Sequence, residues 1–426
     1  MMDDLIENLI SEFKKIKRVH GNLFENFLTF VHLCLTGNKD DKYKVKKDQI
    51  LEYIIMNKKA IVVGGGFAGC TAANILKARG FDCTIIEKSG LLGGGVRTFF
   101  YHGHPYTFGP HHLLVDIDKM FIYDYYSKYV DFYELDHYNM TYVGQDDAFY
   151  TFPIHNDDVQ EMPDAEKIYS ELNNSQNAEP TNFEDYWIGL VGDTLYDKFI
   201  NKYSKKMWGV KNNKEIDEVT FSFKNKKEDN LKKGSKKCFD GKKNVYYPVH
   251  KDGYNRYFDI CADGCNVLLE TTPEKIDPIK KEVTVSGNKM LCDVLVSTVS
   301  PDLLFDYQYG ELPYMGRDFM KLILPIERVT PEPYYFIHYA NDEPFTRVFE
   351  YKLLTRHKSK NTLLGIEFPS KKNKLYPYPI KSEIARAKKY LNLLPDDVYS
   401  IGRSGKYFYD NQDMIIKDCL ELFSKL

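Results

Sequence analysis

The sequence predicts an α/β protein, in which a Rossmann-like FAD-binding domain is combined with a helical domain and an antiparallel β-sheet substrate domain. The first observation is a strand, a Gly-rich turn, a helix and a second strand that follow one another from residue 60 to residue 87. The second is a pair of long helical stretches between residues 117 and 207. The third is a series of short strand-like runs between about residues 284 and 370.

The composition is that of an ordinary globular protein. Of 426 residues, 58 are Lys or Arg and 61 are Asp or Glu, so the formal net charge is −3, and 43% of the residues are hydrophobic. The length suggests two or three domains, and the near-neutral charge argues against a nucleic-acid partner. The eight cysteines have no zinc-like spacing, and no metal is expected. Because no signal peptide or transmembrane segment is visible, we expect a cytoplasmic protein.

Residues 1–57 are predicted to form a separate N-terminal helical extension. Apolar residues recur at helical spacing from Leu5 to Ile16 and again from Phe24 to Leu35, which predicts two amphipathic helices. These helices either pack as a hairpin on the main body or serve as a surface for a partner or a membrane.

The clearest motif is the glycine run at residues 64–69, which follows a short apolar strand and precedes a helix. Gly64 permits a tight turn, Gly66 lets the backbone approach a pyrophosphate, and Gly69 lets the helix pack closely on the strand. The helix N-terminus offers N–H donors to the anion. The second strand ends in Glu87, where a carboxylate would hold a ribose hydroxyl.

A second Gly-rich turn at residues 92–98 comes directly after this unit and favours FAD over NAD. Farther along, residues 224–243 are rich in Lys and form either a solvated loop or a phosphate-attracting flap. The remaining predicted elements are helices over 117–137, 183–207 and 414–423, and strands over 295–299, 334–338, 347–350 and 362–366.

We divide the chain into six parts on this basis. The first is the extension, and the FAD-binding domain is assembled from three separate segments. The predicted parts are 1–57 (extension), 58–116 (FAD-binding), 117–240 (mainly helical, with a mobile loop), 241–299 (FAD-binding), 300–394 (antiparallel sheet) and 395–426 (FAD-binding).

Seven motifs, in the same order along the chain, resemble the flavin-dependent UDP-galactopyranose mutase family. They are Pro105–His111, Glu184–Gly209, Tyr247–Tyr254, Val299–Tyr307, Asn341–Arg347, Tyr376–Ile380 and Gly402–Tyr409. The resemblance spans about residues 58–426. It implies an isomerase of galactofuranose and polysaccharide biosynthesis that interconverts pyranose and furanose forms of a nucleotide sugar, UDP-galactose by default. It also implies FAD, active in the reduced form through attack of N5 on the anomeric carbon, with NAD(P)H or another reductant for activation.

The resemblance assigns roles to individual residues. Those that would bind FAD are Gly64, Gly66, Phe67, Gly69, Glu87, Lys88, Gly94, Gly95, His111, Arg403 and Asn411. Those that would be catalytic are Arg347, His111, Tyr378 and Tyr409. Those that would bind the substrate are Tyr203, Trp208, Arg347, Tyr378 and Tyr409, with Arg347 on the diphosphate. For Tyr378 and Tyr409, packing in the core is the alternative. The nucleotide sugar is the expected partner, and a homodimer is a possible assembly.

The chain departs from the family pattern at the diphosphate clamp and at a second motif histidine. The position three residues after His111 is Leu114, although His112 offers an imidazole nearby. The mobile-loop Arg would fall near Asp193, and no Arg occurs between residues 98 and 255, so half of the clamp is missing. The residues that could substitute are Lys198, Lys202, Lys205, Lys206 and the Lys-rich segment.

The uridine pocket also differs from the family pattern. Ile154, Asp158 and Pro163 stand where relatives carry aromatic rings that sandwich uracil. A carboxylate such as Asp158 could accept two hydrogen bonds from a guanine edge, so a non-UDP sugar such as a GDP sugar is an alternative substrate. Two further alternatives are an FAD-dependent oxidoreductase like the amine oxidases, and a non-catalytic protein that binds FAD or a nucleotide sugar.

Overall fold

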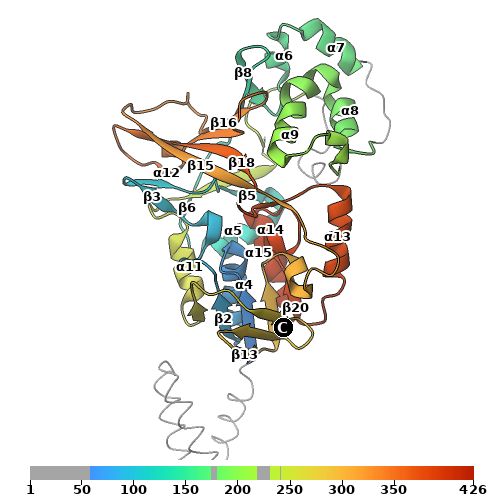
Figure 1. Ribbon diagram of the computed structural model, residues 1–426. Helices are drawn as coiled ribbons and strands as arrows, with labels where there is room; N and C mark the ends of the chain where they lie inside the picture. Colours follow the sequence, from blue (N-terminus) through green and yellow to red (C-terminus); the bar gives the residue numbers. More distant parts are fainter. Residues whose placement is uncertain (1–57, 174–179, 218–230, 240) are drawn as a thin grey trace, which may run out of the picture. The chain divides into compact units, whose positions relative to one another are not determined.

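A five-stranded parallel sheet carries the glycine motif (Figure 1). The computed structural model describes residues 58–173, 180–217, 231–239 and 241–426. The predicted extension of residues 1–57, and residues 224–230 and 240 of the Lys-rich segment 224–243, therefore lie outside the described residues. The strand order is β10-β2-β1-β14-β20, with bounds Asn266–Leu268, Asp82–Ile86, Lys59–Val63, Val294–Ser297 and Val398–Ser400.

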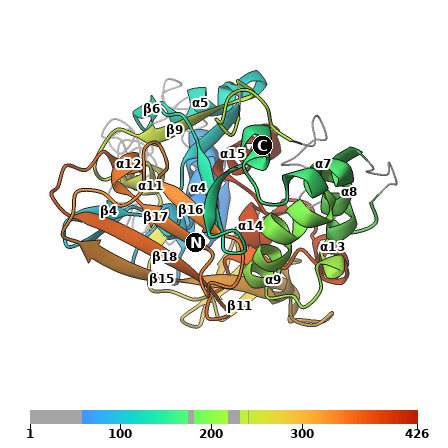
Figure 2. The same ribbon diagram turned by 90° about the horizontal axis from the view of Figure 1, so that it is seen from above.

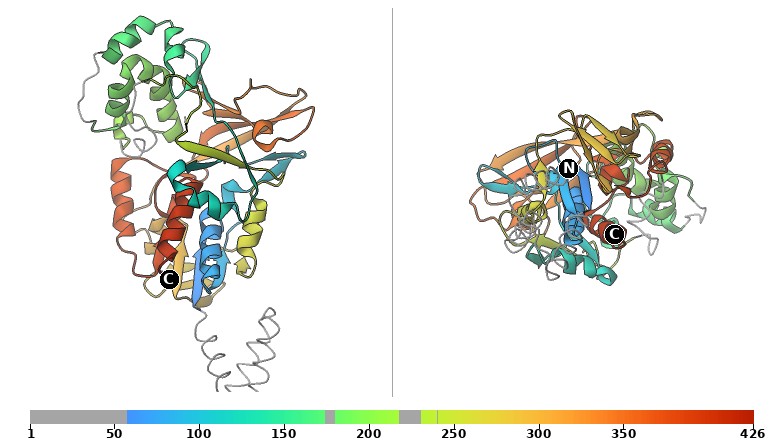
Figure 3. Two further views of the ribbon diagram at one scale, coloured as in Figure 1. Left: turned by 180° about the vertical axis from the view of Figure 1, so that it is seen from behind. Right: turned by 90° about the horizontal axis from the view of Figure 1, so that it is seen from below.

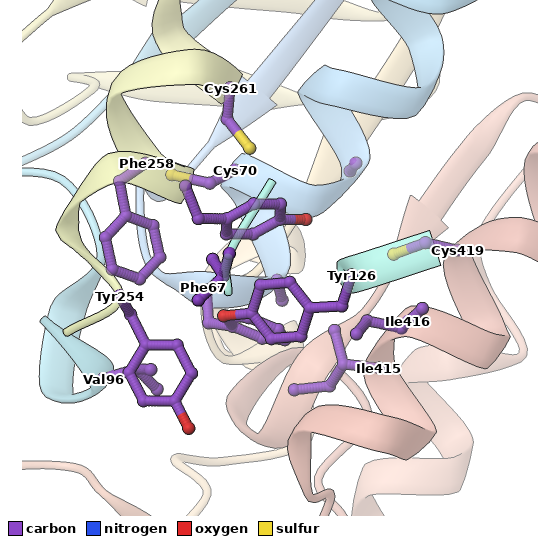
Figure 4. Close-up of a cluster of buried hydrophobic side chains, with 14 of the residues drawn as sticks. Phe67, Cys70, Val96, Tyr126, Tyr254, Phe258, Cys261, Ile415, Ile416 and Cys419 are labelled. Atoms are coloured by element: carbon purple, nitrogen blue, oxygen red, sulfur yellow. The ribbon is translucent and has the colours of Figure 1, made fainter. Parts of the chain in front are cut away.

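Helix α4 (Phe67–Ala78) follows β1 and packs on this sheet, because ten of its twelve residues are buried. Helices α11 (Asn255–Ala262) and α15 (Gln412–Phe423) contact α4, as Figure 3 shows from behind. Figure 4 shows the core between them, where Phe67 of α4 meets the ring of Tyr126 from α5 (Phe121–Tyr126) with 5.7 Å between ring centroids. The N-terminus of α4 is therefore held rigidly beside the glycine turn.

A seven-stranded sheet forms the second layer. Its strand pairs are antiparallel except for β16 and β7, which run parallel. The order is β19-β15-β18-β17-β16-β7-β8, with bounds Tyr376–Pro377, Tyr314–Leu324, Thr362–Ser370, Arg347–Glu350, Phe336–Tyr339, Asn139–Val143 and Ala148–Phe152.

The helical region lies beside this sheet in the view of Figure 2. It consists of α6 (Asn156–Gln160), α7 (Ala165–Asn173), α8 (Phe183–Tyr196), a π-helical turn (Asp197–Asn201) and α9 (Lys202–Trp208). A separate hydrophobic core, which includes both tryptophans, fills this region.

Smaller elements connect these layers. Three short sheets are made by β3 (Phe99–Tyr101) with β4 (His104–Tyr106), by β5 (Leu113–Asp116) with β9 (Lys243–Pro248) and β6 (Phe132–Glu134), and by β11 (Lys275–Asp277) with β12 (Glu282–Val285) and β13 (Asn288–Leu291). The remaining helices are α12 (Lys352–Thr355), α13 (Lys381–Leu391) and α14 (Gly402–Gly405), with short 3-10 turns at Gly94–Val96, Ile117–Lys119, Asn213–Glu215 and Pro301–Phe305.

The predicted fold class is confirmed: a Rossmann-like part, a helical part and an antiparallel sheet are all present. The predicted helix over 117–137 is wrong in its second half, because the aromatic strand β6 pairs with β9 there. Strands β7 and β8 lie in the range expected to be mainly helical and join the seven-stranded sheet. The six domain boundaries stay predictions. Among the described residues, no helix is both long enough and apolar enough to cross a membrane.

Candidate active site

The two Gly-rich turns lie side by side at the carboxyl end of β1. Gly64 has a φ of +98°, a conformation that favours glycine, and the Gly93 N–H donates to the Gly65 carbonyl oxygen over 2.7 Å. A Cβ on Gly69 would lie 1.9 Å from the Gly64 oxygen, so only glycine lets α4 approach this closely. The two turns that the sequence separates by about 25 residues thus form one cradle.

This cradle fits a dinucleotide. A Cβ on Gly66 would meet no described atom within 4 Å, so there is open space next to the N-terminus of α4. The backbone N–H groups of the first turn of α4 can donate to an anion there. The Glu87 carboxylate reaches the turn, where it accepts from the Gly65 N–H (2.7 Å) and from the Ser89 N–H (2.8 Å). Lys88, beside it, is exposed. These residues would hold the pyrophosphate and ribose of FAD.

His111 connects the second Gly-rich turn to the residues that surround the cradle. Its Nε2 lies 3.7 Å from the position of a Cβ on Gly95 and 3.1 Å from the Phe108 carbonyl oxygen. Burial, followed by the charge of Arg403, lowers the pKa of His111 to about 3. The imidazole is therefore neutral at neutral pH.

Arg403 is held by the turn that leads into α15. Its Nε and Nη2 atoms donate to the Asp410 carbonyl oxygen, and its guanidinium lies 4.7 Å from the Tyr376 ring centroid and 4.6 Å from that of Tyr409. Asn411 is the N-cap residue of α15. Several residues predicted to bind FAD therefore come from opposite ends of the chain to the same edge of the parallel sheet.

Arg347 faces a buried carboxylate that the sequence analysis did not identify. Its Nε donates to Glu367 Oε1 (3.1 Å) and its Nη2 to Oε2 (2.5 Å), while 12% of the Arg347 side chain is exposed. Glu367 also accepts from Arg317 Nε (3.1 Å) and from Thr346 Oγ1 (2.7 Å). Burial by itself raises the pKa of Glu367, but the charges of Arg347 and Arg317 outweigh it, so the pKa lies below its ordinary value.

Aromatic rings border this cationic group. Tyr376 and Tyr409 are stacked with 5.4 Å between centroids, and Trp208 meets both rings edge-on at 6.1 and 6.3 Å. Tyr203 lies near Arg347, whose charge acts on its hydroxyl. The Tyr378 hydroxyl lies 3.9 Å from the Met315 sulfur.

A pocket of about 150 Å³ contains three of the predicted substrate residues, Trp208, Tyr378 and Tyr409, in its wall. Lys388 of α13 also lines it, but Arg347 does not. The structure thus brings three of the four predicted aromatic substrate residues to one pocket, whereas Tyr203 and Arg347 lie outside the pocket wall.

Sequence reasoning also missed the partners of His112. The Tyr335 hydroxyl contacts His112 Nδ1 (3.2 Å) and His137 Nδ1, so one buried hydroxyl joins two imidazoles. Burial and the nearby charge of Arg347 lower the pKa of His112 to about 4. The imidazole offered in place of the histidine missing at Leu114 is therefore held by the Tyr335 hydroxyl and lies near enough to Arg347 for its charge to act on it.

The position of the missing mobile-loop Arg lies at a kink in α8. Gly192 has a φ of +81° inside the helix, and the exposed Asp193 follows it. Glu171 closes the kink, because its carboxylate accepts from the Thr194 N–H (2.8 Å) and hydroxyl (2.7 Å). This segment presents a carboxylate at the surface in place of a guanidinium.

Three of the four candidate lysines are engaged elsewhere. Lys198 is buried and pairs with Asp146 and Asp164, and Lys202 pairs with Asp342 over 2.7 Å. Lys206 donates to three carbonyl oxygens, and burial lowers its pKa to about 8. These contacts argue against Lys198 and Lys206 as replacements for the missing Arg. Lys202, whose pair with Asp342 is exposed, and the half-buried Lys205 stay predictions.

Asp158 is also engaged. Its Oδ2 accepts from the Thr151 N–H (2.6 Å) and its Oδ1 from Lys236 Nζ (2.6 Å). The carboxylate that could have read a guanine edge therefore joins α6 to the neighbouring strand and loop. These two hydrogen bonds weaken the structural reason offered for a GDP sugar, and the nucleobase stays a prediction.

Known proteins resemble this chain in sequence and in structure. A family model described as UDP-galactopyranose mutase matches residues 198–409, and one described as an NAD(P)-binding Rossmann-like domain matches residues 62–127. A probable UDP-galactopyranose mutase of Klebsiella pneumoniae is 25% identical over 394 residues, which cover 86% of this chain and 94% of the relative. A dTDP-fucopyranose mutase of Escherichia coli is 23% identical over 385 residues, covering 85% and 97%.

Solved structures agree with these matches. A crystal structure of reduced UDP-galactopyranose mutase superposes with a TM-score of 0.71 and 18% identity, and the match covers 87% of this chain and 95% of that one. The match extends across both the Rossmann-like part, with its glycine cradle, and the part that carries Arg347. The chain belongs to the UDP-galactopyranose mutase family and is an isomerase of that family.

Proposed function

We propose that this protein interconverts the pyranose and furanose forms of a nucleotide sugar, with UDP-galactose as the substrate pair and FAD as the cofactor. The observation that carries the proposal is the placement of Arg347, which lies within electrostatic reach of His111 and His112 near the cradle and of Tyr203 near the aromatic rings. A cation at this point can hold a diphosphate while its sugar faces the flavin.

The residues around Arg347 would each have a separate task. Reduced FAD, when bound, supplies a nucleophilic N5 for the anomeric carbon of the sugar. Arg347 would hold the diphosphate as it leaves and returns, and the hydroxyls of Tyr378 and Tyr409 would donate to the same oxygens. Trp208 and Tyr203 would orient the substrate and keep water from the reacting carbon.

The FAD-binding residues would divide the cofactor between them. Gly64, Gly66 and Gly69 with the start of α4 would hold the pyrophosphate, and Glu87 would accept from a ribose hydroxyl. Gly94, Gly95, His111, Arg403 and Asn411 would lie along the remainder of the cofactor, with Lys88 beside Glu87. The Phe67 ring is buried in the core, so Phe67 would contribute through its backbone N–H at the start of α4.

Turnover by the reduced protein tests the proposal. FAD-loaded enzyme, reduced with dithionite, is incubated with UDP-galactofuranose, and UDP-galactopyranose is measured by chromatography. We expect conversion without stoichiometric consumption of the reductant and none by the oxidised enzyme. NAD(P)H should replace dithionite as activator. Absence of conversion by a preparation that binds FAD would overturn the assignment of this substrate pair.

Other nucleotide sugars are the second candidate substrates. A relative named dTDP-fucopyranose mutase matches most of this chain, so the dTDP form is compared with the UDP and GDP forms in the same assay. Steady consumption of oxygen with an amine would instead favour an oxidase. Light scattering at assay concentration tests the predicted homodimer.

A further inference from the structure

If Arg347 and Glu367 stood alone, the negative charge of Glu367 would cancel the positive charge of Arg347. The bidentate contact uses two of the five N–H donors of the guanidinium and leaves three, so the group can still meet a ligand. An isolated Arg–Glu pair has no net charge, however, and a neutral pair attracts a diphosphate only weakly.

Arg317 lies on the other side of the same carboxylate. Its side chain is fully buried, as is that of Glu367, and its Nε lies 3.1 Å from Glu367 Oε1. Two guanidiniums and one carboxylate give a net charge of 2 − 1 = +1. His111 and His112 add no charge at neutral pH, because burial and the neighbouring arginines lower their pKa values to about 3 and 4.

Arg317 has no contact surface for a ligand of its own. Two of its four other N–H donors bond the carbonyl oxygens of Gly316 (2.6 Å) and Met207 (3.1 Å), and its guanidinium lies 4.7 Å from the Tyr376 ring centroid. Because the Arg317 side chain is fully buried, Arg317 can act on a diphosphate through its charge and through Glu367, but not by direct contact.

We propose that Arg317 is a positioning residue that compensates the charge of Glu367, so that Arg347 presents a full positive charge to the diphosphate of the substrate. Glu367 orients Arg347, and the positive charge of Arg317 offsets the negative charge that Glu367 brings to the site. The inference rests on the proposed function, since it requires a diphosphate ligand. It also explains how a chain without the mobile-loop Arg retains a cationic site.

Charge-restoring variants test this proposal. Pyrophosphate and UDP are titrated into FAD-loaded protein by calorimetry. Arg317→Met removes one positive charge and should weaken binding about tenfold or more, as expected for a unit charge within roughly 8 Å at an effective dielectric of about 20. Glu367→Gln keeps the shape and removes the negative charge. The double variant Arg317→Met/Glu367→Gln has the wild-type sum of charges and should bind within about threefold of wild type.

A purely structural role predicts a different pattern. All three variants would then lose affinity, with the double variant weakest, and that result would overturn the proposal. Arg317→Lys keeps the charge and should bind with an affinity within about threefold of wild type. If Arg317→Met does not fold, Arg317→Lys and the double variant are compared with wild type in its place. Arg79→Met, an exposed Arg at the end of α4, controls for the change in total charge.

The two possible failures are distinguishable. If wild-type protein binds neither pyrophosphate nor UDP, the proposed function fails and this inference fails with it. If wild-type protein binds and Arg317→Met binds equally well, only the role of Arg317 is overturned. Raising the salt concentration should weaken binding more in wild type than in Arg317→Met, because the charge term is larger there.

Discussion

Arg347 and Glu367 stand directly opposite each other across strands β17 and β18. The register of these strands, not a flexible loop, therefore sets the orientation of the guanidinium. Side chains on adjacent strands move little relative to each other, so the cation is preorganised before any ligand arrives. Ligand binding at this site therefore costs little conformational entropy, because Arg347 is already ordered.

Replacing Arg347 tests its place in the site. Arg347→Ala removes a charge-assisted contact worth about 1.5–3 kcal/mol, so kcat/KM should fall about 10- to 150-fold. Arg347→Lys should recover part of the loss, because an ammonium keeps the charge but not the planar fork. Arg79→Met is the matched control in the same steady-state assay. A value for Arg347→Ala within about threefold of wild type would remove Arg347 from the site.

The glycines of the first turn should divide into two classes. Gly66→Val meets open space in the protein, so the apoprotein should fold while flavin binding is lost. Gly69→Ala places a Cβ against the Gly64 oxygen and should destabilise the fold by about 1–3 kcal/mol. Flavin absorbance per protein and urea unfolding of the apoprotein separate the two effects. Full flavin content in Gly66→Val would contradict the placement of the pyrophosphate.

Tyr335→Phe should lower stability without altering the shape of the core. The substitution leaves two buried imidazole nitrogens, on His112 and His137, without their shared hydroxyl partner. An unsatisfied buried polar group costs about 1–3 kcal/mol, which urea unfolding can detect. Tyr399→Phe, whose ring is half-buried, serves as the comparison and should change stability by less than about 0.5 kcal/mol.

Local chemistry explains which parts of the site could be predicted from the sequence. The glycine turn, its helix and Glu87 lie within 30 residues. Each of these residues has a role that follows from its type and its spacing, so the sequence alone predicts it. Glu367 and Arg317 are 50 residues apart and meet only because β18 lies between β15 and β17. The predicted strand 362–366 ends one residue before Glu367 and no element was predicted at Arg317, so the sequence carried no signal for either residue.

The same argument applies to His137 and Tyr335, which are 198 residues apart. No spacing rule connects them, because β16 pairs in parallel with β7 and brings the two regions together. The engaged lysines and Asp158 show the converse. Their residue types suited a ligand, but in the structure they form ion pairs or hydrogen bonds with residues on other elements. The sequence does not reveal these partners.

Trp208 should report ligand binding by its fluorescence. The chain has only two tryptophans, so Trp187→Phe leaves Trp208 as the sole indole. Because Trp208 lines the pocket and contacts the Tyr376 and Tyr409 rings, UDP should change its emission in a saturable way. The midpoint should match the calorimetric Kd. An unchanged emission at saturating UDP would place the ligand away from this pocket.

Two buried histidines should make the protein less stable in acid. His111 and His112 have folded-state pKa values of about 3 and 4, below the ordinary value of 6.5, because burial and nearby arginines disfavour their charged forms. Between about pH 4 and pH 6.5 the unfolded chain therefore binds more protons at these residues, and stability falls as the pH falls. Asp410 acts in the opposite direction, because burial raises its pKa to about 6. In urea unfolding of the apoprotein, His112→Asn should flatten the fall by up to about 1.4 kcal/mol per pH unit, and Asp410→Asn should steepen it. Parallel curves for wild type and His112→Asn would show that His112 is already charged in the folded protein at these pH values.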